Sequence, residues 1–191
     1  MARGTPDWGA VTGGVQAVVE HPTYIVGTED QLPPGAVQTL LSLFNPDASG
    51  RLIKVRRVFV SSGASAFNVS AETRVALYHT TSLGTGAVVT PQALDPNDAI
   101  SVATARSQLS VEPTGKTLLL LHRLAVDRSS VVNQARAFWS DELAEIFNQF
   151  PGQAARPITL LQGRGLAFTT IDAIAAGFGI AAHFMYTEEP S

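Results

Sequence analysis

The stretch PITLLQGRGLAFTT, residues 157–170, together with FGIAAHFMY, residues 178–186, decides the predicted fold. It predicts a strand, a glycine turn, a second strand and a third strand that glycine interrupts. A strand this close to the end of the sequence is stable only when it pairs inside a sheet that earlier residues have built. The run therefore predicts a compact antiparallel β domain.

Further strand patterns, separated by turn residues, extend this prediction back to residue 37. We predict an all-β fold, an antiparallel β-sandwich of jelly-roll-like form, with an extended N-terminal arm and at most one short helix. Residues 1–14 are predicted to be the arm, because glycine and proline are frequent there and few large apolar side chains occur beyond Trp8 and Val11. Residues 15–191 are predicted to form a single β-sandwich domain.

The composition favours a protein that associates with neighbours. Charged residues make up 15% of the 191 residues, against about 25% in ordinary soluble domains. More of the surface must therefore be uncharged, which a subunit tolerates better than a solitary molecule does. We expect a homo-oligomer; the alternative is a small neutral monomer rich in Ser, Thr, Ala and Gly.

Charge and cysteine content exclude several classes of protein. The net charge of −3 gives no general attraction to nucleic acid, and the basic residues Arg51, Lys54, Arg56 and Arg57 are expected to form a solvated strand face. The chain has no cysteine, so disulfides, thiolate metal sites and cysteine nucleophiles are excluded. No secretory signal or membrane span is predicted.

Two strand candidates, residues 37–44 and 52–60, flank a turn at 45–50 that is rich in residues suited to tight turns. We predict that the two strands form a hairpin. In the second strand the alternation of polar and apolar residues shifts phase, since Arg57 occupies an apolar position. This shift predicts a β-bulge near Arg56 and Arg57.

Three further segments carry predictions about the layout. Residues 117–126 are the most apolar strand candidate, and we expect this strand to lie centrally with both faces covered. Residues 82–98 form the longest irregular stretch, and loops of that length are usually functional or contact-making. A short helix is predicted within residues 136–150, with Ser140 as its N-cap.

Catalytic patterns are missing from the sequence. None of the histidines lies in a pair spaced for metal binding on one strand or helix; they are His21, His79, His122 and His183. His122 and His183 are expected to be hydrogen-bonded core or interface residues. There is no nucleophile elbow, phosphate loop or dinucleotide fingerprint. We expect no catalytic residue, no cofactor and no metal ion.

Two weaker signals have ordinary explanations. Asp95, Asn97 and Asp98 supply oxygen atoms of the kind that bind Ca²⁺, but this sequence is also typical of a turn, which we favour. Two carboxylate pairs offer the acid and base of a glycosidase but are predicted to be solvated surface: Glu142 with Glu145, and Glu188 with Glu189.

Several turn and strand motifs in residues 37–189 carry a resemblance to a known group. They are Leu43-Phe44-Asn45-Pro46, a Ser-Gly turn, the strands at 52–60 and 73–78, Gly84-Thr85-Gly86 with Thr90-Pro91 and Leu94-Asp95, and the run from Leu160 to Ala167. In this order they resemble tailed-bacteriophage virion proteins of the capsid decoration or cement type. The resemblance implies a jelly-roll subunit, commonly trimeric, displayed on a capsid or tail, and it implies no catalytic residues. Acidic residues often precede the final glycine of that pattern, whereas this chain has Arg164.

We therefore expect a non-enzymatic virion structural subunit that decorates or cements a phage capsid through symmetric assembly. The expected partners are further copies of the chain, with a trimer favoured, and a major capsid or tail protein; no nucleic acid or membrane is expected. The expected location is the virion, after synthesis in the host cytoplasm. We expect the arm to become ordered on a partner subunit. The expected interaction residues are Trp8, Val11, Gly84, Thr85, Asp95 and Asn97.

Two alternatives stay open. One is a phage tail or fibre head that binds a receptor or carbohydrate, with residues 82–98 as its rim. Exposed aromatic side chains would then be expected, but that loop contains none and the nearest are Tyr78 and Phe67. The other is a cupin-like metal enzyme, which would need clustered histidine and acidic ligands that the spacing disfavours.

Overall fold

All regular structure in the part of the chain that the computed structural model describes is β-strand. The described residues are 21–28, 37–64, 70–127, 157–173 and 178–191. The strands are β1 (Thr23–Gly27), β2 (Thr39–Asn45), β3 (Arg51–Ala64), β4 (Ser70–Thr80), β5 (Thr85–Val89), β6 (Gln92–Ala93), β7 (Thr104–Val111), β8 (Thr117–Asp127), β9 (Ile158–Leu160), β10 (Arg164–Thr170) and β11 (Phe178–Pro190). None of these residues belongs to a helix suited to crossing a bilayer. The predicted arm at 1–14 and the predicted helix within 136–150 lie outside the described residues.

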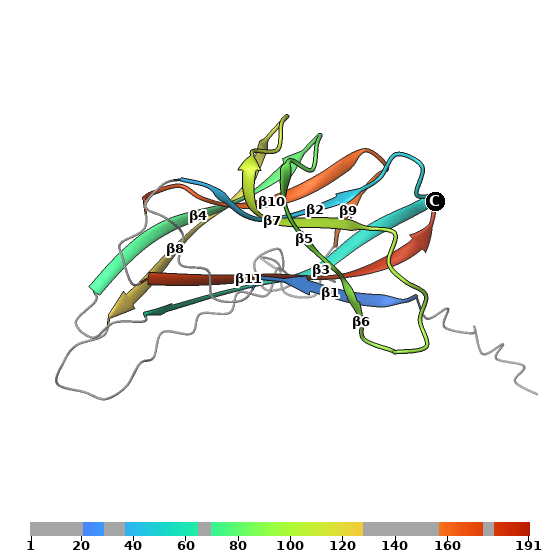
Figure 1. Cartoon of the computed structure of the whole chain (residues 1–191), viewed down its shortest axis with the longest axis horizontal. Coiled ribbons are helices and arrows are strands. Elements are labelled where there is room, and N and C mark those ends of the chain that lie inside the picture. Colours follow the sequence, from blue (N-terminus) through green and yellow to red (C-terminus); the bar gives the residue numbers. More distant parts are fainter. Residues whose placement is uncertain (1–20, 29–36, 65–69, 128–156, 174–177) are drawn as a thin grey trace, which may run out of the picture.

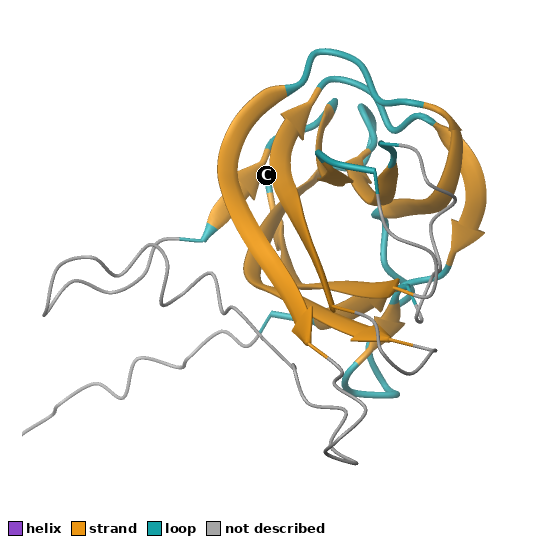
Figure 2. Cartoon of the chain, turned by 90° about the vertical axis from the view of Figure 1, so that its left-hand side faces the viewer, coloured by secondary structure: helices purple, strands orange, loops and turns teal. Residues whose placement is uncertain are grey.

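Two antiparallel sheets pack against each other (Figure 1). A five-stranded sheet has the order β6-β1-β11-β3-β9, and a six-stranded sheet has the order β5-β7-β2-β10-β4-β8. Within these sheets, β1-β11-β3-β9 faces β2-β10-β4-β8, which is the strand order of a jelly roll. Figure 2 shows the strands curving around a common interior. The predicted all-β antiparallel sandwich is confirmed.

The segment from β5 to β7 is an insertion between two neighbouring strands of the jelly roll, β4 and β8. β6 pairs with β1 at the edge of one sheet, while β7 pairs with β2 and β5 with β7 at the corresponding edge of the other. The insertion thus extends both sheets on the same side of the sandwich. The predicted irregular stretch at 82–98 is therefore partly wrong, because it contains β5 and β6.

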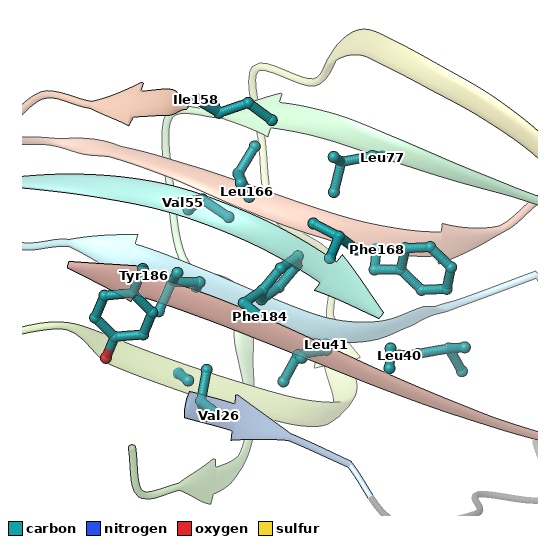
Figure 3. Packing of buried hydrophobic residues seen from close by; sticks show 14 of the residues in the cluster. Val26, Leu40, Leu41, Val55, Leu77, Ile158, Leu166, Phe168, Phe184 and Tyr186 are labelled. Carbon is teal, nitrogen blue, oxygen red and sulfur yellow. The ribbon is translucent and has the colours of Figure 1, made fainter. Parts of the chain in front are cut away.

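The core forms because strand residues alternate between two faces, and the inward face of each sheet is apolar. Figure 3 shows these side chains converging between the sheets, among them Phe184 from β11 and Phe168 from β10. The rings of Tyr24 and Tyr186 stack with their centroids 5.5 Å apart. The largest side chains that are almost completely buried are Tyr24, Tyr186, Phe184, Leu40, Leu41, Leu43, Ile53, Leu77, Leu160 and Leu166.

The predicted hairpin of β2 and β3 is wrong, because the two strands belong to different sheets. The turn between them carries the chain from one layer to the other. Asn45, at the end of β2, holds this corner: its side-chain amide donates to the carbonyl oxygens of Arg51, at 2.9 Å, and Leu160, at 3.0 Å. Turn residues predicted the reversal of the chain but not the change of sheet.

The predicted bulge in β3 is confirmed. Met185 of β11 lies opposite Arg57, and the next residue, Tyr186, lies opposite Val55. Arg56 is therefore the extra residue, and the register shifts at this point. The bulge lets Val55 and Val58, which are three positions apart, both be buried.

The prediction that the leucine-rich strand lies centrally is also wrong. Among the strands that the structure describes, β8 is the outermost of its sheet and pairs only with β4. Leu119 and Leu120 are partly buried against the core, but Leu118 and Leu121 are 53% and 50% exposed. A run of apolar residues does not by itself place a strand in the middle of a sheet.

Candidate interaction surface

The candidate interaction surface is apolar and lies on the outer face of β4 and β8. Leu77 and Leu120 lie opposite each other and face the core, so their neighbours Ala76 and Leu121 lie on the other face, where Ala76 is buried and Leu121 is exposed. Leu118 lies opposite Tyr78 on the same outward face, after a bulge in β8. We call Tyr78, Leu118 and Leu121 the leucine strip.

Charged pairs border the leucine strip at two places. On one side, Lys116 lies 5.6 Å from the centre of the Tyr78 ring and 2.6 Å from the Glu112 carboxylate. On the other side, Arg74 binds Asp172 at 2.7 Å. The strip therefore has an apolar middle and a charged margin.

The buried residue Thr39 holds the carboxylate of the first of these pairs. The Thr39 backbone amide donates to Glu112 Oε1 at 2.9 Å, and the Thr39 hydroxyl donates to Glu112 Oε2. Burial alone would raise the pKa of the Glu112 carboxyl, but its hydrogen bonds with Lys116 and Thr39 outweigh that effect, and the pKa lies below its ordinary value. Glu112 is thus held ionised at the margin of the strip.

Gly84 and Thr85, two of the predicted interaction residues, lie in the connection from β4 to β5 and at the start of β5. Gly84 has a φ of 79° and sits tightly against β7, where an added Cβ would lie 2.6 Å from the Val111 carbonyl oxygen. The Thr85 carbonyl accepts a hydrogen bond from the Ser110 hydroxyl at 3.3 Å. Both residues therefore pack or hydrogen-bond against β7 within the fold.

The β4–β5 connection stands beside the connection from β7 to β8, and both rise from the six-stranded sheet (Figure 1). The Thr81 amide donates to the Thr114 carbonyl at 2.9 Å, and the Thr114 amide donates to the Ser82 hydroxyl at 2.8 Å. These hydrogen bonds join the two loops to each other next to the leucine strip.

Asp95 and Asn97 form a turn, as predicted. The Asn97 backbone amide donates to Asp95 Oδ1 at 2.9 Å, and the Asp98 amide donates to the Asp95 carbonyl at 3.0 Å. The turn has exposed apolar neighbours, Leu94 at 53% and Ile100 at 90%. Trp8 and Val11 lie outside the described residues, so the structure does not test them.

The prediction that Glu188 is solvated surface is wrong, and Glu189 is partly buried, with 16% of its side chain exposed. Glu188 is only 4% exposed, and it accepts hydrogen bonds from the Ser101 hydroxyl at 2.5 Å and the Val102 amide at 3.0 Å. It anchors the loop between β6 and β7 to β11. Glu189 instead pairs with Lys54 at 2.5 Å and Arg56 at 3.3 Å, which places those basic residues on an ion-paired strand face.

No group of three or more histidine and acidic side chains suited to a metal ion occurs in the described ranges. His183 packs against Gly27, and burial lowers the pKa of its imidazole. His79 lies at the end of β4, where burial likewise lowers its pKa and the nearby charge of Arg164 lowers it further.

Sequence reasoning missed the leucine strip because it assigned the apolar run to the interior. The signal that was present is the length of that run: in a strand, successive side chains point to opposite faces, so four consecutive leucines place apolar groups on both faces. Comparison of the chain with protein-family models, with curated proteins and with solved structures found no match.

Proposed function

We propose that this chain is a non-enzymatic structural subunit of a phage virion that associates with copies of itself and decorates or cements a capsid. The leucine strip is the observation that carries the proposal. Two neighbouring leucines on an outermost strand are about half exposed, at 53% and 50%, between two charged pairs. An apolar centre with a polar margin is the usual anatomy of a protein interface.

The occupant that we propose for the strip is a second copy of the chain. An outermost strand with exposed apolar side chains is a common place for association. In a closed ring each strip contacts a different patch on the next copy, whereas in a two-fold dimer it contacts itself. The low charge content of 15% favours such contacts, because less charge must be removed from water.

The assignment to a virion rests on the resemblance in residues 37–189. That resemblance implies a jelly-roll shell subunit, and the strand order observed in the described residues agrees with a jelly roll. Jelly rolls also serve other functions. Assembly of the chain and its attachment to particles therefore test the assignment to a virion.

The test of assembly uses the full chain and its point variants in sedimentation equilibrium. The wild type should be a homo-oligomer, with a trimer favoured, and Leu118→Glu or Leu121→Glu should dissociate it. Val88→Glu is the matched control, since Val88 is a 69% exposed aliphatic residue on β5, away from the strip, and should leave the oligomer intact. A monomeric wild type, or strip variants that assemble normally, would overturn the proposal.

The test of attachment follows the chain on particles. The chain should co-purify in fixed proportion with phage particles assembled in cells that express it, when these are separated on a density gradient. Deletion of residues 1–14 should preserve the circular dichroism spectrum of the sandwich but lower the amount bound. Absence of the chain from purified particles would contradict the assignment to a virion.

A further inference from the structure

A pocket of about 330 Å³ lies at the edge of the sandwich that the β5–β7 insertion leaves open. The end of β4 and the start of β8 provide one wall, and β9 with the start of β10 provides the other. A volume of this size lies at the lower end of the range for small-molecule sites. The residues that line it are His79, Thr80, Thr81, Gly115, Thr117, Thr159, Leu161 and Arg164.

The side chains in this pocket include several hydrogen-bond donors and one cation. Threonine hydroxyls come from both walls, Thr117 on β8 and Thr159 on β9, and both residues are exposed. Arg164 adds a guanidinium, whose planar set of N–H groups matches the geometry of a carboxylate or phosphate. None of these lining residues carries a carboxylate, so the pocket has positive charge without an internal counter-ion.

Arg164 differs from the arginines that the fold uses. Arg74 is held by Asp172 and Arg56 by Glu189, but no ion pair of Arg164 is found within the ranges that the structure describes. Its charge is instead felt by His79, the other basic group of the pocket. A guanidinium in a pocket whose lining residues include no carboxylate leaves a favourable position for an anion.

The geometry points to a binding site for a small oxyanion, a carboxylate or phosphate group, carried by a hydroxylated ligand of the size of one sugar ring. Arg164 binds the oxyanion by a bidentate contact. Thr117, Thr159 and His79 hydrogen-bond the hydroxyl groups, which both donate and accept, and Leu161 contacts the apolar face of the ring. This site is independent of assembly through the leucine strip, so either proposal can fail alone.

The test is isothermal titration calorimetry of the full chain with four probes: glucuronate, glucose, glucose 6-phosphate and inorganic phosphate. Glucuronate differs from glucose mainly by its carboxylate, so glucuronate should bind at least about tenfold more tightly, as expected for a hydrogen-bonded ion pair. Tighter binding of glucose 6-phosphate than of inorganic phosphate identifies a sugar-borne anion. Equal binding of these two overturns the sugar part of the proposal and leaves a free oxyanion as the ligand.

Variants assign the binding to this pocket. Arg164→Gln should weaken glucuronate binding about tenfold or more, and Arg164→Lys should weaken it less, because lysine keeps the charge but not the bidentate geometry. Arg56→Gln removes an arginine charge outside the pocket and should have no effect. The His79 imidazole resonances should shift on titration with glucuronate. Binding no tighter than that of glucose, or equal binding by Arg164→Gln and wild type, would overturn the proposal.

Discussion

Ser101 and Glu188 are joined by a hydrogen bond of 2.5 Å that ties the loop before β7 to the last strand of the sandwich. The same carboxylate oxygen accepts from the backbone amides of Val102, at 3.0 Å, and Ala103, at 3.3 Å. The Tyr186 hydroxyl lies 2.7 Å from the Ser101 hydroxyl. A buried carboxylate is thus satisfied by groups from the loop, and the loop takes its position from the carboxylate.

Glu188→Ala should lower the free energy of unfolding by about 2 kcal/mol, because buried donors lose their acceptor. Hydrogen exchange of the Val102 and Ala103 amides should become faster. Glu189→Ala is the matched control on the opposite face of β11, where removal of a surface ion pair costs less than about 1 kcal/mol. Urea unfolding of both variants checks the prediction, and equal losses would show that Glu188 does not anchor the loop.

Glu188 also shows which structural features can be predicted from the sequence and which cannot. Phe184, Tyr186 and Glu188 occupy alternate positions of one strand, so the periodicity assigns all three to the inward face. The partners of Glu188 cannot be read from any local pattern, because they lie 85, 86 and 87 positions away in the chain. The sequence therefore contained evidence for burial but not for the hydrogen bonds that permit it.

The arrangement of strands could likewise be predicted from the sequence only in part. The bulge at Arg56 was predictable because a bulge changes the phase of polar and apolar residues within one strand. The position of β8 at the edge of its sheet, and the change of sheet between β2 and β3, depend on which strands pair. Pairing is a property of distant segments, so the leucine strip became visible only with the fold.

Asn45 should tolerate substitution poorly, because its side chain is fully buried and joins the two sheets at a corner. Asn45→Ala leaves two backbone carbonyls without their donor and should cost about 2 kcal/mol. Asn45→Asp should cost more at neutral pH, since it directs a carboxylate at those carbonyls. Burial raises the pKa of such a group, so the loss should diminish as the pH falls and the carboxyl is protonated.

Urea unfolding at several pH values tests this order. Asn97→Asp is the control, because Asn97 is in an exposed turn and should change the stability little. An Asn45→Asp protein as stable as the wild type at neutral pH would refute the role of the amide as a donor from β2 to two strands of the five-stranded sheet.

Gly84→Ala should destabilise the fold more than Gly50→Ala. Both glycines have positive φ, 79° and 62°, so alanine is strained at each by about 1 kcal/mol or slightly more. Only Gly84 also lacks space: its added methyl group would lie 2.6 Å from the Val111 carbonyl oxygen, whereas nothing lies within 4 Å at Gly50. Thermal unfolding of the two variants measures the difference, and equal effects would remove the steric explanation of Gly84.

Asp172 should titrate far below an ordinary aspartate. The hydrogen bond from the Arg74 side chain, and then that from its backbone amide, lower the pKa of the carboxyl to about 2. The pair therefore stabilises the fold fully above the ordinary aspartate pKa of about 3.9, and this contribution is lost as the pH falls through about 2. Carbon-detected NMR of the carboxyl group measures the midpoint.

Arg74→Gln should raise this midpoint only part of the way, because the backbone amide of residue 74 still donates to Asp172 Oδ2 at 3.0 Å. The difference in stability between wild type and variant should shrink as the pH is lowered from 4 towards 2, since protonation removes the charge that Arg74 binds. High salt should shrink it as well, because the pair is exposed. A midpoint in the ordinary aspartate range in the wild type would mean that the pair does not persist in solution, and the charged margin of the leucine strip would then have to be assigned to other residues.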